Sequence, residues 1–437
     1  MKFDPSLDEI DAMTRRAHAL VDAVNAACKA RGIAGRATIQ GSVAKQTWLP
    51  GSVDLDCFVL VPTSEPESAL KALAEAVSGD VLAHPKKKYA QHPYVVGEFQ
   101  GAQVDLVPAY DVGSPEHIQS AVDRTPFHTE WVNANLSDAQ KHEVRRLKAW
   151  CKGTALYGAE TKIGGFSGYL LEVLVHHAGT MDGVLTWMRG DERRVALGAD
   201  EVKDDVSPLV VVDPIDATRN CAAAVTAQTL ERAAAAAAAY QAAPGPRFYE
   251  PAPPASRAKL AQALEADELD WAGLLLKPES DRLDIVFPQF QRAARLLADG
   301  IERIGFPVVR HHVTELEGTV AMQWVTKKVQ RPPTRLQKGP RADKPENVKK
   351  FKAKWSNDDR RVGDFEEVDG VLQVELRETN QTAEDALREL IQKGGYAKHF
   401  QAALKQHTLL TDPAAAPDDW NISDCILGQE PWQRPTS

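Results

Sequence analysis

The segment that most constrains this chain is GSVAKQTWLPGSVDLDCFVLVP, residues 41–62, which ends in an apolar strand carrying two carboxylates. Residues two apart in a strand project from the same face, so we expect Asp54 and Asp56 to point together while Leu55 and Cys57 face a core. Two adjacent carboxylates repel each other unless a cation lies between them. Because Mg²⁺ takes oxygen ligands and keeps water and substrate phosphates among them, the pattern predicts a magnesium site at this strand.

A third carboxylate, Asp105, lies in the strand-like run AQVDLVPAY, where Val104 and Leu106 project from the other face. If this strand pairs beside the first, three carboxylates meet at one edge and could hold two divalent ions about 4 Å apart. Gly41 and Ser42 lie upstream, in a flexible turn whose backbone N–H groups can approach phosphate oxygens. The combination favours metal-assisted phosphate chemistry over a solvated strand end.

The bulk composition indicates a packed protein of several domains. A chain of 437 residues with 43% apolar residues predicts two to four domains. It contains no run of about 18 apolar residues, so no membrane span is expected. The N-terminus, MKFDPSLDEI, lacks a hydrophobic signal region, and the five cysteines form no C-x-x-C pair. We therefore expect a cytoplasmic protein with reduced thiols and without a zinc site or disulfide framework.

The charge is unevenly distributed along the chain. The segment 327–361 carries 13 lysines and arginines against four acidic residues, a net charge of +9 within a chain whose total is −9. A basic segment on an acidic body is compatible with RNA binding through one face. A solvated charged loop explains the charge equally well.

The amino-acid sequences of several motifs resemble those of a known family. Gly-Ser, then D-x-D, then a later strand Asp resembles the DNA polymerase beta-like nucleotidyltransferase superfamily. The residues within and around these motifs are similar to those of archaeal-type (class I) CCA-adding enzymes, which build the 3′-terminal CCA of tRNA without a nucleic-acid template. The similar blocks are residues 41–62, 91–108, 122–128 (VDRTPFH), 156–175 and 210–226.

The resemblance implies roles for particular residues. Asp54, Asp56 and Asp105 would be catalytic and would hold Mg²⁺. The implied nucleotide-binding residues are Gly41, Ser42, Lys45, His128, Lys148, Tyr157 and Arg219. Lys45 stands where the family usually has Arg, which keeps the charge but loses the bidentate phosphate geometry.

Simpler interpretations remain for individual members of this set. A solvated helix face would explain Lys148, a structural ring would explain His128, and an ion pair at a helix start would explain Arg219. His92, in the block 91–108, could touch substrate, although its position before Pro93 at a strand start favours a structural role.

The same resemblance implies an α/β (α+β) architecture in three parts. Residues 1–137 would form a nucleotidyltransferase catalytic head with a mixed sheet. Residues 138–255 would form a helical central domain that completes the nucleotide pocket. Residues 256–437 would form an RNA-recognition-like α/β body, with a basic tail insertion at about 317–370. The implied partners are CTP, ATP and the acceptor stem and elbow of tRNA, and a homodimer is expected.

Local patterns add further expectations. Apolar spacing predicts one amphipathic helix from residue 6 to about 31. Pro126 is expected to interrupt any helix in the run 120–132, and Val371–Leu376 is expected to be a strand of the body. The residues from about Asp412 onward read as loosely ordered.

Three functions follow from these patterns. The first is addition of C, C and A to tRNA from CTP and ATP. The second is a poly(A), oligoadenylate or cyclic-nucleotide synthase of the same superfamily, which the carboxylates alone do not separate from the first. The third is a non-catalytic RNA-binding protein on a retired polymerase scaffold, which the presence of all three carboxylates and the Gly-Ser turn disfavours.

Overall fold

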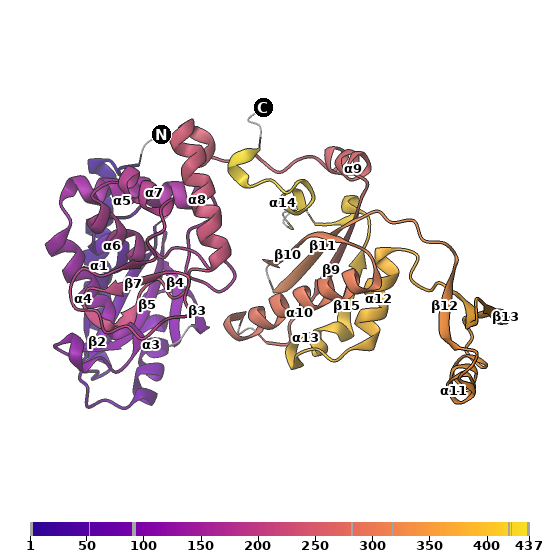
Figure 1. Cartoon of the computed structure of the whole chain (residues 1–437). Helices are drawn as coiled ribbons and strands as arrows, with labels where there is room; N and C mark the ends of the chain where they lie inside the picture. The colour runs from indigo at the N-terminus through magenta and orange to yellow at the C-terminus, as the bar shows by residue number, and fades with distance from the viewer. Residues whose placement is uncertain are drawn as a thin grey trace. The chain divides into compact units, whose positions relative to one another are not determined.

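The computed structural model describes residues 3–51, 53–89, 93–280, 283–316, 318–417, 420 and 422–434. The chain divides into two compact units, one comprising Met1–Ala252 with Glu430–Ser437 and the other Pro253–Gln429 (Figure 1). No described helix is long and apolar enough to cross a membrane.

The first unit begins with a mixed five-stranded sheet. Its strand order is β1 (Arg36–Gln40), β2 (Leu55–Val61), β5 (Ala102–Tyr110), β4 (Pro93–Phe99) and β3 (Ala83–Tyr89). Strands β2 and β5 run parallel, and the other pairs are antiparallel.

Helices α1 (Leu7–Ala30) and α3 (Glu67–Val81) pack on one face of this sheet. The capping box between Ser6 and Glu9 starts α1, because each side chain accepts a backbone hydrogen bond from the other residue. The single long helix expected at this end of the chain is therefore confirmed.

The opposite face of the sheet carries a smaller apolar group, formed by Phe58, Leu60, Val107 and Ala109. Beyond it, the 3₁₀ turn Ala121–Arg124 leads into α4 (Thr125–Asn135). The expectation that Pro126 interrupts a helix here is wrong. Pro126 lies in the first turn of α4, where its missing N–H has no intrahelical partner to lose.

The rest of the first unit is mainly helical. It contains α5 (Asp138–Gly153), α6 (Gly168–Ala178), α7 (Met181–Met188) and α8 (Ala227–Ala242). A small sheet joins β6 (Arg194–Val195), β7 (Val210–Asp213) and β8 (Asp216–Asn220), in that order. Trp150, Phe166 and Phe248 are fully buried in the shared core.

The second unit is built on an antiparallel sheet of order β10 (Val308–Leu316), β11 (Thr319–Lys327), β9 (Leu269–Leu276) and β15 (His407–Leu410). One core joins the sheet to α10 (Leu283–Ile304), α12 (Ala383–Lys393) and α13 (Lys398–Ala403). A second core joins it to α9 (Arg257–Ala266) and α14 (Ile422–Leu427).

The basic segment and the residues after it, up to Arg377, form a separate small sheet of order β12 (Thr334–Arg341), β14 (Val371–Arg377) and β13 (Arg361–Val368), with α11 (Pro345–Trp355) against it (Figure 1). Trp355, Val374 and Leu376 form its core. The residues expected as a strand of the body, 371–376, therefore pair with β12 and β13 instead. The fourth body strand is β15.

Several described residues after Asp412 are packed in a core, contrary to the expectation of loose order from that residue onward. Trp420 is fully buried in the core of the second unit, and Trp432 is buried in the core of the first. Arg232 of α8 holds Glu430 through two hydrogen bonds of 2.8 and 2.7 Å. The polar and Pro-rich composition of this stretch suggested loose order, although its few large aromatic residues are buried and hold it in place.

Candidate active site

The strand carboxylates of the predicted site lie side by side. Strands β2 and β5 pair in parallel, and their register sets Asp56 directly opposite Asp105. Both face away from α1 and α3, because their strand neighbours Leu55 and Leu106 belong to the core under those helices. Asp54 immediately precedes β2 and is exposed. The alternation expected from the sequence is therefore confirmed for Asp56 and Asp105, whereas Asp54 lies outside the strand.

Of these carboxylates, Asp56 and Asp105 are half-buried and Asp54 is exposed. Within the described part of the chain, none of Asp54, Asp56 and Asp105 accepts a hydrogen bond at its carboxylate or forms an ion pair. Burial, and then the charge of Asp105, raises the pKa of Asp56 to about 7. Burial, and then the charge of Asp54, raises the pKa of Asp105 to about 6. A cation placed between these groups would relieve the repulsion.

The donor set fits a divalent cation. Carboxylate oxygens without protein partners are the ligands that hard cations take, with water and phosphate oxygens completing the shell. Across the residues that the structure describes, no three His, Cys, Asp or Glu side chains converge on a single metal position. A bound cation would therefore depend on oxygens from outside the protein for the rest of its coordination.

The Gly41 turn lies against Asp56. Gly41 begins the short helix α2 (Gly41–Ala44) with φ +65°, and a Cβ at this position would lie 1.8 Å from Asp56 Oδ2. Only glycine allows both this backbone conformation and this approach. The carbonyl of Ser42 accepts a hydrogen bond from Thr47 N at 2.9 Å, which ties the turn to the residues described next.

Two of the predicted lysines share one buried carboxylate. Glu172 of α6 accepts from Lys45 Nζ at 2.6 Å, from Lys148 Nζ at 2.9 Å and from Thr47 Oγ1 at 2.6 Å. We call Lys45, Thr47, Lys148 and Glu172 the Glu172 cluster. All four residues are buried. Burial opposes ionisation, but the charges of Lys148 and Lys45 hold the pKa of Glu172 at about 2.

Lys148 uses all of its hydrogen-bond donors inside this cluster. Besides Glu172, its Nζ donates to Thr47 Oγ1 at 2.9 Å and to the Thr47 carbonyl at 3.2 Å. A lysine ammonium has three N–H groups. A direct contact between Lys148 and a phosphate would therefore require the exchange of one of these bonds. Burial lowers the pKa of Lys148, and Glu172 opposes that shift.

The other predicted pair, His128 and Arg219, meets at Asp213. Asp213 Oδ2 accepts from His128 Nε2 at 2.9 Å and from Arg219 Nη1 at 2.6 Å. Asp213 Oδ1 accepts from Tyr169 Oη at 2.9 Å. We call His128, Tyr169, Asp213 and Arg219 the Asp213 cluster. Burial lowers the pKa of His128, although the bond to Asp213 opposes this.

Helix α6 joins the two clusters, because it carries both Tyr169 and Glu172. The Tyr169 ring stacks on His128 with 3.8 Å between the ring centroids, and Lys45 Nζ lies 5.5 Å from the Tyr169 centroid. The charges of Lys45 and Lys148 also act on Asp56, where they lower its pKa against the effect of burial. The predicted residues therefore form one connected region.

Tyr157 lies beside this region. A Cβ on Gly168 would be 3.0 Å from Tyr157 Oη and 3.3 Å from Lys148 Cε, so both side chains approach the start of α6. Burial raises the pKa of Tyr157, which keeps the phenol neutral. Lys152 Nζ lies 5.3 Å from the centroid of the Tyr157 ring.

Sequence reasoning missed the residues that hold the predicted ones in place. These are Thr47, Tyr169, Glu172 and Asp213. One signal was available: Glu172 is the single acid within the apolar helix GYLLEVLV, and a buried charge requires a partner. His92, considered as a substrate contact, lies outside the described residues.

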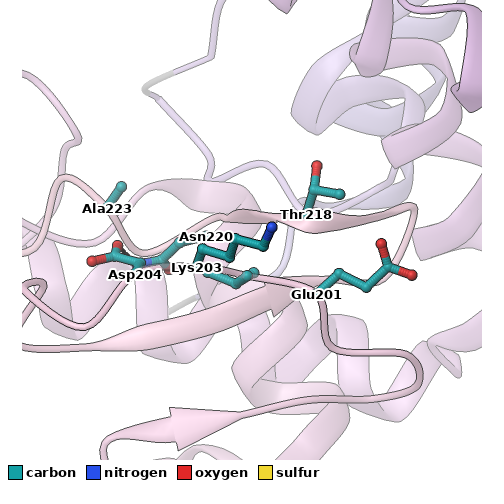
Figure 2. Close-up of a pocket in the computed structure, with 7 residues that line it drawn as sticks. Glu201, Lys203, Asp204, Thr218, Asn220 and Ala223 are labelled. Carbon is teal, nitrogen blue, oxygen red and sulfur yellow. Dashed lines mark hydrogen bonds between the residues drawn. The ribbon is translucent and has the colours of Figure 1, made fainter.

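A pocket of about 690 Å³ lies beside β8, on the side of the strand opposite to Arg219 (Figure 2). Thr218 and Asn220 of this strand line it, together with Glu201, Lys203 and Asp204, which are labelled in Figure 2. Arg219 alternates with Thr218 and Asn220, so it faces away from this pocket. Asn220 holds Asp204 at 3.1 Å and the Leu209 carbonyl at 2.9 Å, which is a structural role.

Family comparisons divide the chain into three matched segments. Residues 21–128 match the nucleotidyltransferase domain, residues 142–250 match the second domain of tRNA nucleotidyltransferase, and residues 278–412 match the C-terminal domain of the CCA-adding enzyme. The expected fold class, a mixed α/β nucleotidyltransferase head followed by a helical part and an α/β body, is confirmed.

Similar proteins cover most of the chain. The CCA-adding enzyme of Methanoregula boonei is 34% identical over 361 residues, which are 80% of this chain and 77% of that protein. The CCA-adding enzyme of Thermoplasma acidophilum is 30% identical over 390 residues, which are 89% and 88% of the two chains. Among solved structures, CdnC of E. coli MS115-1 with ATP gives a TM-score of 0.43 at 18% identity, over 56% of this chain and 91% of that chain.

The identity and coverage of the sequence relatives agree with the motif resemblance. The three matched segments follow one another along the chain in the order head, second domain and C-terminal domain. The chain belongs to the family of CCA-adding enzymes.

Proposed function

We propose that this protein adds C, C and A to the 3′ end of tRNA, using CTP and ATP and releasing pyrophosphate. The observation that supports this most is the pairing of Asp56 with Asp105 beside the Gly41 turn, within a chain of the CCA-adding family. The attacking group is the 3′-hydroxyl of the RNA, and the bond that breaks joins the α- and β-phosphates of the nucleotide.

Asp56 and Asp105 together, with Asp54 two residues before Asp56, would hold Mg²⁺ at this site. A bound divalent cation supplies Lewis-acid activation of the 3′-hydroxyl and neutralises charge on the triphosphate and the leaving pyrophosphate. We assign Asp105 to the side of the attacking hydroxyl, where its carboxylate can accept a proton.

The remaining predicted residues would bind and orient the nucleotide. The backbone N–H groups of the Gly41–Ser42 turn approach its phosphates. Lys45 and Lys148 contribute positive charge, of which Glu172 neutralises one unit. His128, Tyr157 and Arg219 would line the pocket around the base and ribose.

The tRNA would be held by its acceptor stem and elbow. Helix α11, which packs against the small sheet of β12, β14 and β13, carries four lysines, Lys349, Lys350, Lys352 and Lys354. Contacts of this kind to phosphates position a nucleic acid without reading its sequence. The family resemblance also leads us to propose a homodimer and a cytoplasmic location.

Acceptor choice tests this proposal against a poly(A), oligoadenylate or cyclic-nucleotide synthase. The full-length protein is incubated with Mg²⁺ and ATP alone, and the acceptor is tRNA that already ends in CCA, an unstructured RNA oligomer, or no RNA. We expect no extension and no nucleotide product in any arm, because the next nucleotide is added only to an incomplete tRNA end. Long adenylate tails, or a product formed without RNA, would support the alternative.

A further inference from the structure

The carboxylate of Asp213 accepts more hydrogen bonds than one ion pair with Arg219 would provide. Its side chain has no exposed surface and lies at the end of β7. Oδ2 receives His128 and Arg219, and Oδ1 receives Tyr169 Oη and, at 3.1 Å, the backbone N–H of Ile215. Four donors from three elements and one turn therefore meet at a single carboxylate.

This arrangement fixes the tautomer of His128. The charges and hydrogen bonds around Asp213 hold its pKa at about 2 against the effect of burial, so it is an acceptor only. We therefore assign the ring hydrogen to His128 Nε2, which leaves Nδ1 as the free acceptor of a neutral imidazole. The Tyr169 ring, stacked with an interplanar angle of 23°, fixes the plane of the imidazole.

The same carboxylate fixes the orientation of the Arg219 guanidinium group. Only Nη1 of its guanidinium bonds to Asp213, and 37% of the side chain is exposed. The rest of the planar fork remains accessible, and an arginine held at one nitrogen has a fixed direction for the other donors. His128, with 12% of its side chain exposed, lies at the border of the same accessible region.

We propose that Asp213 is the positioning residue that sets the hydrogen-bonding directions of both His128 and Arg219 toward the incoming nucleotide. This inference rests on the proposed function of the site. Asp213 does not touch the nucleotide itself, because its carboxylate is fully buried and both of its oxygens are occupied.

A purely electrostatic role would give the opposite effect. A neutral His128, a positive Arg219 and a negative Asp213 sum to zero charge, so the cluster as it stands does not attract a triphosphate. Removal of the Asp213 charge would leave Arg219 uncompensated and would strengthen the attraction. If the role of Asp213 is instead to orient His128 and Arg219, its removal weakens nucleotide binding even though the local charge becomes more favourable for a triphosphate.

Kinetics of CTP addition to tRNA that lacks CCA separate these cases. We compare the full-length protein with Asp213→Ala, Asp213→Asn and the control Asp216→Asn, which removes a carboxylate that pairs with Arg124 at 3.2 Å on the same hairpin. For Asp213→Ala we expect the KM for CTP to rise about 10- to 100-fold, comparable to the loss when a residue that orients a metal ligand is removed. Asp213→Asn, which keeps one acceptor oxygen, should show a smaller rise, and the control should match the wild type.

A second readout does not depend on activity. With ¹⁵N-labelled histidine, we expect the imidazole of His128 to show the Nε2–H tautomer in the wild type and to lose this preference in Asp213→Ala, with His128→Asn assigning the signal. An unchanged KM and an unchanged tautomer in a folded Asp213→Ala or Asp213→Asn variant would overturn the positioning role. So would a lower melting temperature with wild-type KM. If the wild-type protein did not transfer nucleotides from CTP to tRNA, the proposed function would be refuted. The tautomer experiment would still decide the role of Asp213.

Discussion

Replacing Asp56 by Asn lowers nucleotide addition to tRNA by about 10³-fold or more, because it removes a central oxygen ligand from the carboxylate pair. Asp56 lies opposite Asp105 and against Gly41, so the loss falls at the point where the cation and the phosphates would meet. Single-turnover addition of C to tRNA lacking CCA measures the effect. Binding of tRNA, followed by fluorescence anisotropy, should remain near that of the wild type.

The same substitution should not weaken the fold. The pKa of Asp56 is raised from 3.8 to about 7, so the folded state holds this proton more tightly than the unfolded chain does. That contribution to stability is present below pH 3.8 and is lost as the pH rises through 7. At pH 8 in EDTA, Asp56→Asn should therefore melt at or above the wild-type temperature.

The control for this prediction is Asp111→Asn, at the end of the same sheet away from the carboxylate pair. Asp111 forms an exposed pair with Arg36 at 3.2 Å, and its loss should leave both addition and melting near wild type. If Asp56→Asn lost tRNA binding and activity in equal measure, Asp56 would not be the ligand that we assign.

Replacing Glu172 by Gln has the largest expected effect on stability. Glu172 and both of its lysine partners are buried, and removal of the acid leaves two ammonium groups with only uncharged acceptors. Breaking a buried ion pair on one side costs about 3–5 kcal/mol in the free energy of unfolding. Urea unfolding of the full chain, followed in the transition of the first unit, measures this loss.

The control is Glu384→Gln, which removes a carboxylate of the second unit that pairs with Arg388 on the surface at 2.6 Å. Such pairs contribute about 0–1 kcal/mol. The pH dependence provides a further check. The pKa of Glu172 is lowered to about 2, so its stabilisation is present above pH 4.5 and is lost as the pH falls toward 2. A Glu172→Gln loss within about 1 kcal/mol of the control would contradict this account of the cluster.

The sequence was most informative where a local rule and a family motif coincide. Alternation in 55–61 and 102–110 predicts which face of each strand carries a carboxylate, and the parallel register places Asp56 opposite Asp105. The Gly-Ser turn could be placed near phosphates, but the approach of Gly41 to Asp56 depends on tertiary packing that the sequence does not encode locally.

The supporting residues were harder to predict, because each acts across a large distance in the chain. Glu172 meets Lys45 from 127 positions away, and Asp213 meets His128 from 85 positions away. Alternation predicts that β14 is a strand but does not predict its partner, which is why the expectation that it belongs to the body sheet is wrong. Side-chain periodicity fixes which face a strand buries, and partner choice is decided by the fold as a whole.

Stepwise nucleotide addition decides whether this site builds CCA. The full-length protein with Mg²⁺ receives tRNA that ends at the discriminator base, with CTP alone, with ATP alone and with both, and the 3′ ends are resolved to single nucleotides. We predict that CTP alone adds two C residues, and that one A follows them only when ATP is also present. Long A tails from ATP, or products made without RNA, would contradict CCA addition and, with it, every tRNA contact proposed for the basic segment.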